Sequence, residues 1–312
     1  MSRHRQPLPF DANNHFVTDA GLETELIFKK HYNLPEFASF PLLEIEQGVG
    51  DLKEYYEHYI AIARQHHTGL ILEAPTWRAS QQWGTRLGYN SQQLDTINRQ
   101  AIAFLETLRN NADLVQPCLI SGCIGPRFDG YNPDQYMSIE QAEQYHSQQI
   151  KTFRETAADL VSALTMTSFS EACGITLAAN KYGIPVVISF TTETDGCLPS
   201  GESLQSAIEQ IDELTDAYPV HYMINCAHPT HFETAIDQQQ PWVKRIGGIR
   251  ANASCKSHAE LDECTELDDG DPKELGLRYK KLKQHLHNLT VVGGCCGTNH
   301  HHVAEMTQAC FS

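Results

Sequence analysis

The sequence is short of basic residues. Lys and Arg number 23 against 39 Asp and Glu among 312 residues, which gives a formal net charge of −16. Proteins that bind nucleic acid need a basic surface to displace counterions from the phosphate backbone, and binding to anionic lipid headgroups requires the same. The charge therefore argues against nucleic acid and membrane surfaces as partners.

Long apolar segments are missing too. No stretch reaches the roughly 18 uninterrupted apolar residues of a membrane helix, and residues 1–14 lack the apolar centre of a secretory signal. We therefore expect a cytoplasmic protein without a membrane span. The length alone would allow two domains, but α/β barrels of this size fold as one domain. We expect a single barrel domain over residues 1–312.

A glycine-rich phosphate loop is the third absence. After the first apolar run the chain reads Asp-Ala-Gly-Leu-Glu-Thr-Glu at residues 19–25, which is not G-x-G-x-x-G, and no Walker-type loop occurs. An open doubly wound sheet would more often carry such a loop after its first strand. That fold is therefore the second choice for this chain.

What the sequence does contain is a regular alternation of short apolar runs and longer helical patterns. The apolar runs, each a candidate strand, cover residues 15–20, 69–74, 114–123, 159–165, 185–191, 220–226, 243–249 and 289–293. The helical patterns cover residues 52–66, 91–109, 138–158, 170–182, 203–217, 230–239, 272–285 and 300–309. Eight strand–helix units in 312 residues predict an α/β fold, the closed (β/α)8 TIM barrel.

Ten cysteines stand out in a chain that we expect to be reduced. Disulfide scaffolds belong mainly to small secreted domains, so each cysteine here is a core residue, a metal ligand or a nucleophile. Cys226 ends the sixth predicted strand, and Cys295 and Cys296 follow the eighth. Barrels carry their active sites at the carboxyl ends of the strands, so these three thiols can converge there.

Three converging thiolates would suit Zn²⁺, which prefers sulfur and nitrogen ligands in a tetrahedral array. Three protein ligands leave a fourth position open, as in catalytic zinc sites. From spacing alone, core packing of these cysteines is an equal alternative, because neither C-x-x-C nor H-E-x-x-H is present.

The residues of one segment say more about the role of these cysteines than their spacing does. Residues 292–298, Val-Gly-Gly-Cys-Cys-Gly-Thr, resemble the zinc-binding segment of the homocysteine S-methyltransferase family. Residues 19–26 and the Ile-Asn-Cys of residues 224–226 agree, with fainter matches at 76–80, 124–126 and Asn252. These segments follow the family's order over nearly the whole chain. The resemblance implies a zinc-containing barrel whose metal ligands are Cys226, Cys295 and Cys296.

The same resemblance implies a methyl transfer to a thiol. A thiol with a pKa of ~8.5 is mostly protonated at neutral pH, and zinc in contact with its sulfur would favour the nucleophilic thiolate. The thiolate attacks the methyl group of a small donor, and homocysteine then becomes methionine. We therefore expect a zinc-dependent S-methyltransferase of methionine biosynthesis.

The family's substrate contacts map onto a few residues of this chain. Asp19 keeps the first-strand aspartate that holds the substrate amino group. The backbone N–H groups around Gly21 are predicted to meet the substrate carboxylate. Thr165 and Asn225 complete the expected substrate set or only brace the strand ends.

The fourth predicted strand departs from the family. Members commonly end this strand in Cys-Glu-Thr, whose glutamate holds the amino group of homocysteine, whereas residues 163–165 read Ala-Leu-Thr. Leu164 cannot pair with an ammonium, and burying an unpaired ammonium is costly. Glu23, Glu73 or Glu193 would replace the lost carboxylate, and Glu23 is the first choice because the family has a small residue there. Otherwise the acceptor is a different thiol.

The methyl donor is less defined. Family members use S-methylmethionine, S-adenosylmethionine, betaine or methyltetrahydrofolate, and the folate–cobalamin members are much longer than 312 residues. The length therefore favours a small donor, and Trp77, Phe128 and Tyr131 offer aromatic faces for a sulfonium or quaternary ammonium. Two other hypotheses stay open: a zinc- or thiol-binding barrel without transferase activity, and a structural barrel with core cysteines. The oligomeric state, a homo-oligomer included, does not follow from the sequence.

Overall fold

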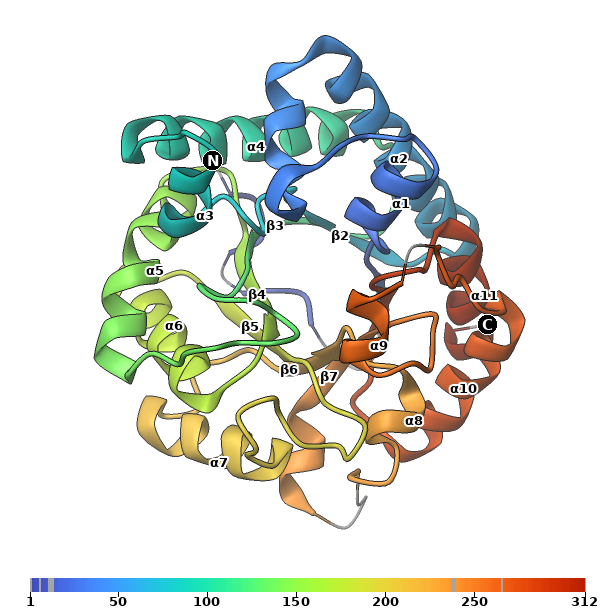
Figure 1. Ribbon diagram of the computed structural model, residues 1–312. Coiled ribbons are helices and arrows are strands. Elements are labelled where there is room, and N and C mark those ends of the chain that lie inside the picture. The colour runs from blue at the N-terminus through green and yellow to red at the C-terminus, as the bar shows by residue number, and fades with distance from the viewer. Residues whose placement is uncertain (1, 6, 11–13, 237–239, 265, 312) are drawn as a thin grey trace.

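Eight parallel strands form a closed barrel with the helices around it (Figure 1). The computed structural model describes residues 2–5, 7–10, 14–236, 240–264 and 266–311. Each strand pairs with the next one in sequence, and the last pairs with the first, so that Phe16 lies beside both Gly69 and Val291. The predicted (β/α)8 TIM barrel is confirmed, and the open doubly wound sheet is excluded.

All eight predicted strands are present, with shifted bounds. They are β1 (Phe16–Val17), β2 (Gly69–Glu73), β3 (Cys118–Ile124), β4 (Leu160–Met166), β5 (Val186–Phe190), β6 (Tyr222–Asn225), β7 (Ile246–Ala251) and β8 (Val291–Gly294). The start of the third prediction is wrong by several residues. Residues 114–117 read Leu-Val-Gln-Pro. Val115 is 95% exposed, and Pro117 has no N–H to donate to a strand ladder.

Seven long helices fill the predicted positions, and short ones were not anticipated. The helices are α1 (Leu22–Phe28), α2 (Glu46–His66), α3 (Gln81–Arg86), α4 (Ser91–Asn111), α5 (Ile139–Arg154), α6 (Phe169–Tyr182), α7 (Leu204–Thr215), α8 (Pro229–Phe232), α9 (His258–Asp262), α10 (Pro272–His285) and α11 (His300–Phe311). Single 3₁₀ turns lie at η1 (Pro35–Phe37), η2 (Phe40–Glu44) and η3 (Pro241–Arg245). The helix predicted over 230–239 is reduced to α8, and its residues 237–239 lie outside the described residues.

Local sequence signals fix several helix ends. Ser138 and Gln141 form the predicted capping box at the start of α5, each side chain accepting a backbone N–H of the other. Asp271 accepts from two backbone N–H groups at the start of α10. Gly183 ends α6 in the left-handed conformation, with a φ of 66°.

The barrel interior is closed at one end and open at the other. A separate apolar cluster takes one buried residue from each of seven strands, namely Phe16, Ile71, Leu119, Leu160, Val187, Met223 and Val291. These residues lie at or near the amino ends of their strands. The cluster fills the amino end of the barrel, so a ligand can enter only from the carboxyl ends.

The ring of helices closes where the first helices of the chain meet the last one. Figure 1 shows α11 beside α1 and α2, and α11 packs against α2. None of the helices in the described residues combines the length and apolarity that a membrane crossing requires.

Candidate metal and substrate site

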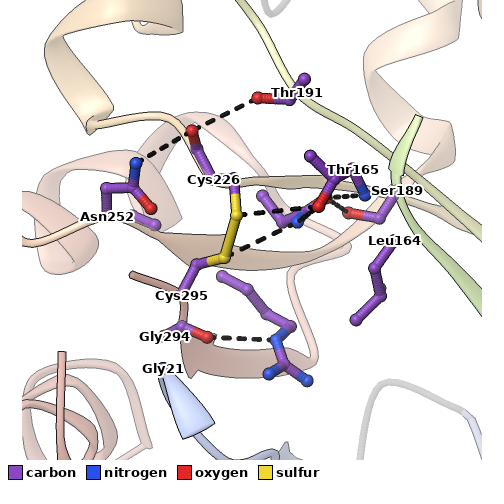
Figure 2. The surroundings of a disulfide bond; sticks show 12 residues. Gly21, Leu164, Thr165, Ser189, Thr191, Cys226, Asn252, Gly294 and Cys295 are labelled. Atoms are coloured by element: carbon purple, nitrogen blue, oxygen red, sulfur yellow. Dashed lines mark hydrogen bonds between the residues drawn. A yellow bond between two sulfur atoms is a disulfide. The ribbon is translucent and has the colours of Figure 1, made fainter. Parts of the chain in front are cut away.

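Three cysteine sulfurs meet at the open end of the barrel. Cys226 directly follows β6, and Cys295 and Cys296 directly follow β8. Their sulfur atoms lie within 4.8 Å of one another, so the structure brings together the thiols that the sequence singles out. Cys226 and Cys295 form a disulfide bond, which the sequence did not predict (Figure 2). Cys296 has a free thiol. The role of the three as zinc ligands stays a prediction.

The backbone of β7 positions both ends of this disulfide. β7 lies between β6 and β8 and pairs with each of them. The carbonyl of Arg250 accepts the N–H of Cys226 at 3.1 Å, and the carbonyl of Ala251 accepts the N–H of Cys295 at 2.9 Å. One strand therefore sets the separation of cysteines that are far apart in the sequence.

Asn225 connects the strand ends to the sulfurs (Figure 2). Its Oδ1 accepts the N–H of Thr165 at 2.8 Å and the hydroxyl of Ser189 at 2.7 Å. Its Nδ2 donates to Thr165 Oγ1 at 2.8 Å and lies 3.8 Å from the Cys295 sulfur. The Thr165 hydroxyl in turn lies 3.7 Å from the Cys226 sulfur. The structure thus shows Thr165 and Asn225 as braces of the cysteines, and their contact with substrate stays a prediction.

Gly21 contacts the loop that follows β8 and contains Cys295 and Cys296, here called the cysteine loop. A Cβ at this position would lie 2.6 Å from the Cys295 carbonyl oxygen and 2.5 Å from Thr24 Oγ1. The start of α1 therefore packs against the cysteine loop at a distance that only glycine allows. The Gly21 N–H donates to the Thr298 carbonyl at 3.3 Å, so its predicted bond to a substrate carboxylate would replace this one.

Asp19 is buried and already paired. Its Oδ1 lies 2.7 Å from Nη2 of Arg250, and its Oδ2 accepts the hydroxyl of Tyr55 at 3.1 Å. Burial raises the pKa of Asp19, and the Arg250 guanidinium opposes this rise. Sequence reasoning missed Arg250 because the predicted seventh strand stopped at residue 249. A single arginine directly after an apolar strand run was the available signal.

Two of the three proposed replacement carboxylates line the same cavity as the cysteines. Glu73 is 4% exposed, and its Oε1 lies 4.0 Å from Nη1 of Arg250. Glu23 accepts the Ser39 hydroxyl at 2.8 Å. Burial is the largest cause that raises the pKa of both glutamates, that of Glu73 to about 7. Glu193 is instead 3.0 Å from the His258 ring and does not line this cavity.

The cavity combines the cysteines, the carboxylates and an apolar wall. Its described lining is Asp19, Ala20, Gly21, Leu22, Glu23, Thr24, Phe37, Glu73, Ala74, Pro75, Trp77, Cys123, Leu164, Thr165, Asn225, Cys226, Arg250, Cys295 and Cys296. Leu164 is part of this lining, so the position where the resemblance leads us to expect a glutamate presents an alkyl side chain to the cavity. The structure places every predicted substrate residue around one space.

The three predicted aromatic faces lie in different places. Trp77 lines the cavity, but the Arg78 guanidinium already stacks 4.0 Å from its ring centre. Tyr131 lines a neighbouring cavity that shares Cys296 with the first, and its ring stacks on His258 at 4.2 Å. Phe128 lines neither of these two cavities. Only Trp77 and Tyr131 are therefore near the sulfurs.

The remaining cysteines of the described residues lie outside this cluster. The free thiols are Cys118, Cys123, Cys173, Cys197, Cys255, Cys264 and Cys310 together with Cys296. Cys123 lines the cavity but is not one of the three clustered sulfurs. Cys255 is exposed, which makes it a useful control for experiments on the cluster.

The sequence of the chain is similar to proteins of one known family. A family model described as homocysteine S-methyltransferase matches residues 16–310. A protein named homocysteine S-methyltransferase 1 from Arabidopsis thaliana is 29% identical over 181 residues, which are 56% of this chain and 52% of the relative. Its namesake from Brassica oleracea var. italica is 30% identical over 182 residues, with the same shares. The chain thus spans about half the length of the curated relatives it matches.

Solved structures show the same fold. The oxidized form of the homocysteine methyltransferase MmuM from Escherichia coli superposes with a TM-score of 0.74 at 18% identity, covering 98% of each chain. The metallated form of that protein gives a TM-score of 0.72 at 18% identity, covering 95% of this chain and 96% of that one. At this identity the likeness concerns the barrel fold.

Proposed function

Because the chain belongs to the homocysteine S-methyltransferase family, we propose that it transfers a methyl group from a small donor to the sulfur of homocysteine, giving methionine. The observation that carries the proposal is the convergence of three cysteine sulfurs within 4.8 Å at the open end of the barrel. The acceptor thiol loses its proton, its sulfur forms the new bond to the methyl carbon, and the bond from that carbon to the donor breaks.

The cysteine cluster fits zinc, which we propose as the cofactor. Tetrahedral zinc with Zn–S bonds of about 2.3 Å requires sulfurs roughly 3.8 Å apart. The three sulfurs lie within 4.8 Å of one another, and those of Cys226 and Cys295 must separate on reduction of their disulfide to reach that spacing. Cys226, Cys295 and Cys296 would hold the ion. Bound zinc would supply Lewis acidity that favours the thiolate form of the acceptor. Cys226 and Cys295 must be reduced before they can act as ligands, because a disulfide has no thiolate to offer.

The chain's own residues supply order around the reacting sulfur. Asn225 and Thr165 hold the ligand cysteines in place, as outer contacts of metal ligands commonly do. We also propose that Asp19, Gly21 and Glu23 bind the amino-acid part of the acceptor, since all three line the cavity with the cysteines.

The donor is proposed to be a small cation of the S-methylmethionine, S-adenosylmethionine or betaine type. The cavity on the far side of Cys296 contains the ring of Tyr131 and the carboxylate of Asp262. An aromatic face and a carboxylate both attract sulfonium and quaternary ammonium groups. A donor there would lie next to the cysteine cluster because both cavities include Cys296.

A second acceptor class is favoured by Leu164. An alkyl side chain lines the cavity where the family has a glutamate, so a thiol without an amino group is the alternative to homocysteine. Failure to methylate any thiol would leave a zinc- or thiol-binding barrel.

Wider properties of the chain are proposals as well. We propose one barrel domain over residues 1–312, a cytoplasmic location and small molecules as partners, in a monomer or homo-oligomer. The location is supported by the eight cysteines without a disulfide partner in the described residues, because reducing compartments keep thiols free.

Zinc analysis tests the cofactor. Protein reduced with a phosphine and dialysed with zinc is expected to retain about one zinc per chain, and Cys295→Ser to lose it, since two remaining thiolates hold zinc weakly. The matched control is Cys255→Ser, which removes an exposed thiol outside the cluster and should retain the metal. Reduced wild-type protein that binds no zinc would contradict the proposal.

A grid of donors against thiol acceptors tests the reaction. Zinc-loaded protein is incubated with each pair of compounds, and methylated thiol is measured by mass spectrometry. Methionine formed from homocysteine is the expected product, whereas product only from thiols without an amino group would favour the second acceptor class.

A further inference from the structure

We propose that Glu73, fixed beside Arg250 and Asp19, binds the ammonium group of the acceptor and makes the enzyme specific for an amino-acid thiol. This inference rests on the proposed function and extends it. It assigns the role of the family's missing glutamate to the end of β2 instead of β4.

The first argument is a count of buried charges. Arg250 lies 2.7 Å from a carboxylate oxygen of Asp19 and 4.0 Å from one of Glu73. All three residues are 4% exposed. Two carboxylates therefore share one guanidinium, and the cluster has one negative charge in excess whenever both carboxylates are ionised. A buried charge is stabilised when an opposite charge pairs with it, so the cluster favours a cationic ligand.

The second argument is the hydrogen bonding of each group. Arg250 Nε donates to the Gly294 carbonyl at 3.1 Å, and its Nη2 faces Asp19. The second oxygen of Asp19 accepts the Tyr55 hydroxyl. Glu73 Oε2 is buried without a hydrogen-bond partner, as are Arg250 Nη1 and the Asp19 oxygen that pairs with the guanidinium. A buried acceptor of this kind is costly unless a ligand completes it, and an ammonium supplies both the hydrogen bond and the charge.

The third argument is position. Glu73 lines the same cavity as the three cysteines and Leu164. An amino-acid thiol whose sulfur lies at the cysteines places its ammonium inside this cavity. The side chain of Leu164 offers no hydrogen bond there, so the ammonium must find its partner on another strand end.

Glu23 is the rival carboxylate and is less suited. Its Oε1 already accepts the Ser39 hydroxyl at 2.8 Å, and its side chain is only partly buried. No ion pair fixes it within the described residues, whereas Glu73 lies against the guanidinium of Arg250. The first choice made from the sequence, Glu23, is therefore replaced by Glu73 for this role.

The test compares two acceptors that differ only in the amino group. Homocysteine and its deaminated analogue, 4-sulfanylbutanoate, are titrated by calorimetry into reduced, zinc-loaded protein, which yields a ratio of dissociation constants without any turnover. Wild-type protein should prefer homocysteine. Glu73→Gln should weaken homocysteine binding about 10–100-fold, the range for a charged hydrogen bond, and leave the analogue unchanged.

Glu193→Gln is the matched variant, since its carboxylate lies beside the His258 ring and does not line the cavity, and it should change the ratio little. Equal weakening of both ligands by Glu73→Gln would indicate a purely structural role and overturn the inference. A loss of preference in Glu23→Gln alone, or no preference in wild-type protein, would overturn it as well. Methyl transfer is measured separately on the wild-type protein, so its absence would refute the proposed function while the binding ratio still decides the role of Glu73.

Discussion

At the scale of the residue, two backbone conformations mark the site. Thr165 and Cys226 have φ angles of 63° and 52°, in the left-handed region that residues other than glycine rarely enter. Each such conformation costs about 1–3 kcal/mol and persists where the surroundings enforce it. Asn225 does so by bonding both the N–H and the hydroxyl of Thr165. The strain thus lies at the two residues whose hydroxyl and sulfur point at each other.

The pH dependence of acceptor binding follows from Glu73 at the same scale. Burial and Asp19 raise its pKa, while Arg250 and the hydroxyls of Ser121 and Ser162 lower it, with a result of about 7. Glu73 is ionised above this pH and neutral below it, so its attraction for an ammonium weakens as the pH falls. The ratio of KM for 4-sulfanylbutanoate to KM for homocysteine should therefore fall about tenfold between pH 8 and pH 6.

Effects of pH on the metal or on the thiol act on both acceptors and cancel in that ratio. Glu73→Gln should give a ratio independent of pH over this range. A wild-type ratio that stays constant would contradict the assignment.

At the scale of the element, β7 and the start of α1 hold the cysteine loop from two sides. β7 bonds the N–H groups of Cys226 and Cys295, and Gly21 approaches the Cys295 carbonyl closely enough to exclude a side chain. The proposed metal ligands therefore depend on elements that contribute no ligand themselves.

Gly21→Ala tests this dependence. The added Cβ would lie 2.6 Å from the Cys295 carbonyl oxygen, so α1 or the cysteine loop must move. We expect a loss of about 1–3 kcal/mol in the free energy of unfolding, measured by urea denaturation, together with weaker zinc binding in a chelator competition.

Gly50→Ala is the matched control for that experiment. Gly50 lies inside α2, and a Cβ there would have no neighbour within 4 Å. Alanine in a helix interior stabilises by about 1 kcal/mol over glycine, so this variant should gain stability and keep its zinc affinity. Equal behaviour of the two variants would mean that the contact at Gly21 does not position the loop.

Strands and long helices could be predicted from the sequence because their hydrophobic pattern extends over many residues. Short helices and contacts between distant strands could not, because tertiary structure determines them. Eight apolar runs predicted the strands and hence the convergence of Cys226 with Cys295 and Cys296. The short helices α1, α3 and α9 have too few residues for a pattern. The pairing of Arg250 with Asp19 joins β7 to the loop that follows β1 across the barrel opening. The arginine itself had a local signal, but its partner depends on strand register.

At the scale of the whole molecule, metal binding should raise the free energy of unfolding. A ligand that binds only the folded state adds about 4 kcal/mol when its concentration is 1,000 times Kd. Zinc should therefore raise the Tm of reduced protein by several degrees, read by calorimetry and reversed by a chelator.

Protein that keeps the disulfide between Cys226 and Cys295 is the control for this measurement. It has two fewer thiolates for the ion, so its Tm should respond little to zinc. An equal rise in both forms would show that zinc binds elsewhere on the molecule.

The pairing of β1 with β8 also bears on the order in which the chain folds. β1 has two residues, and both pair with β2 on one side and β8 on the other. Contacts between distant parts of a chain form slowly because they close the largest loops. Asp19 follows β1, and two of the clustered cysteines follow β8. Until β8 has been synthesised, Cys226 is the one cysteine of the three-sulfur cluster that the growing chain contains. The site is therefore assembled only when the last strand has paired with the first.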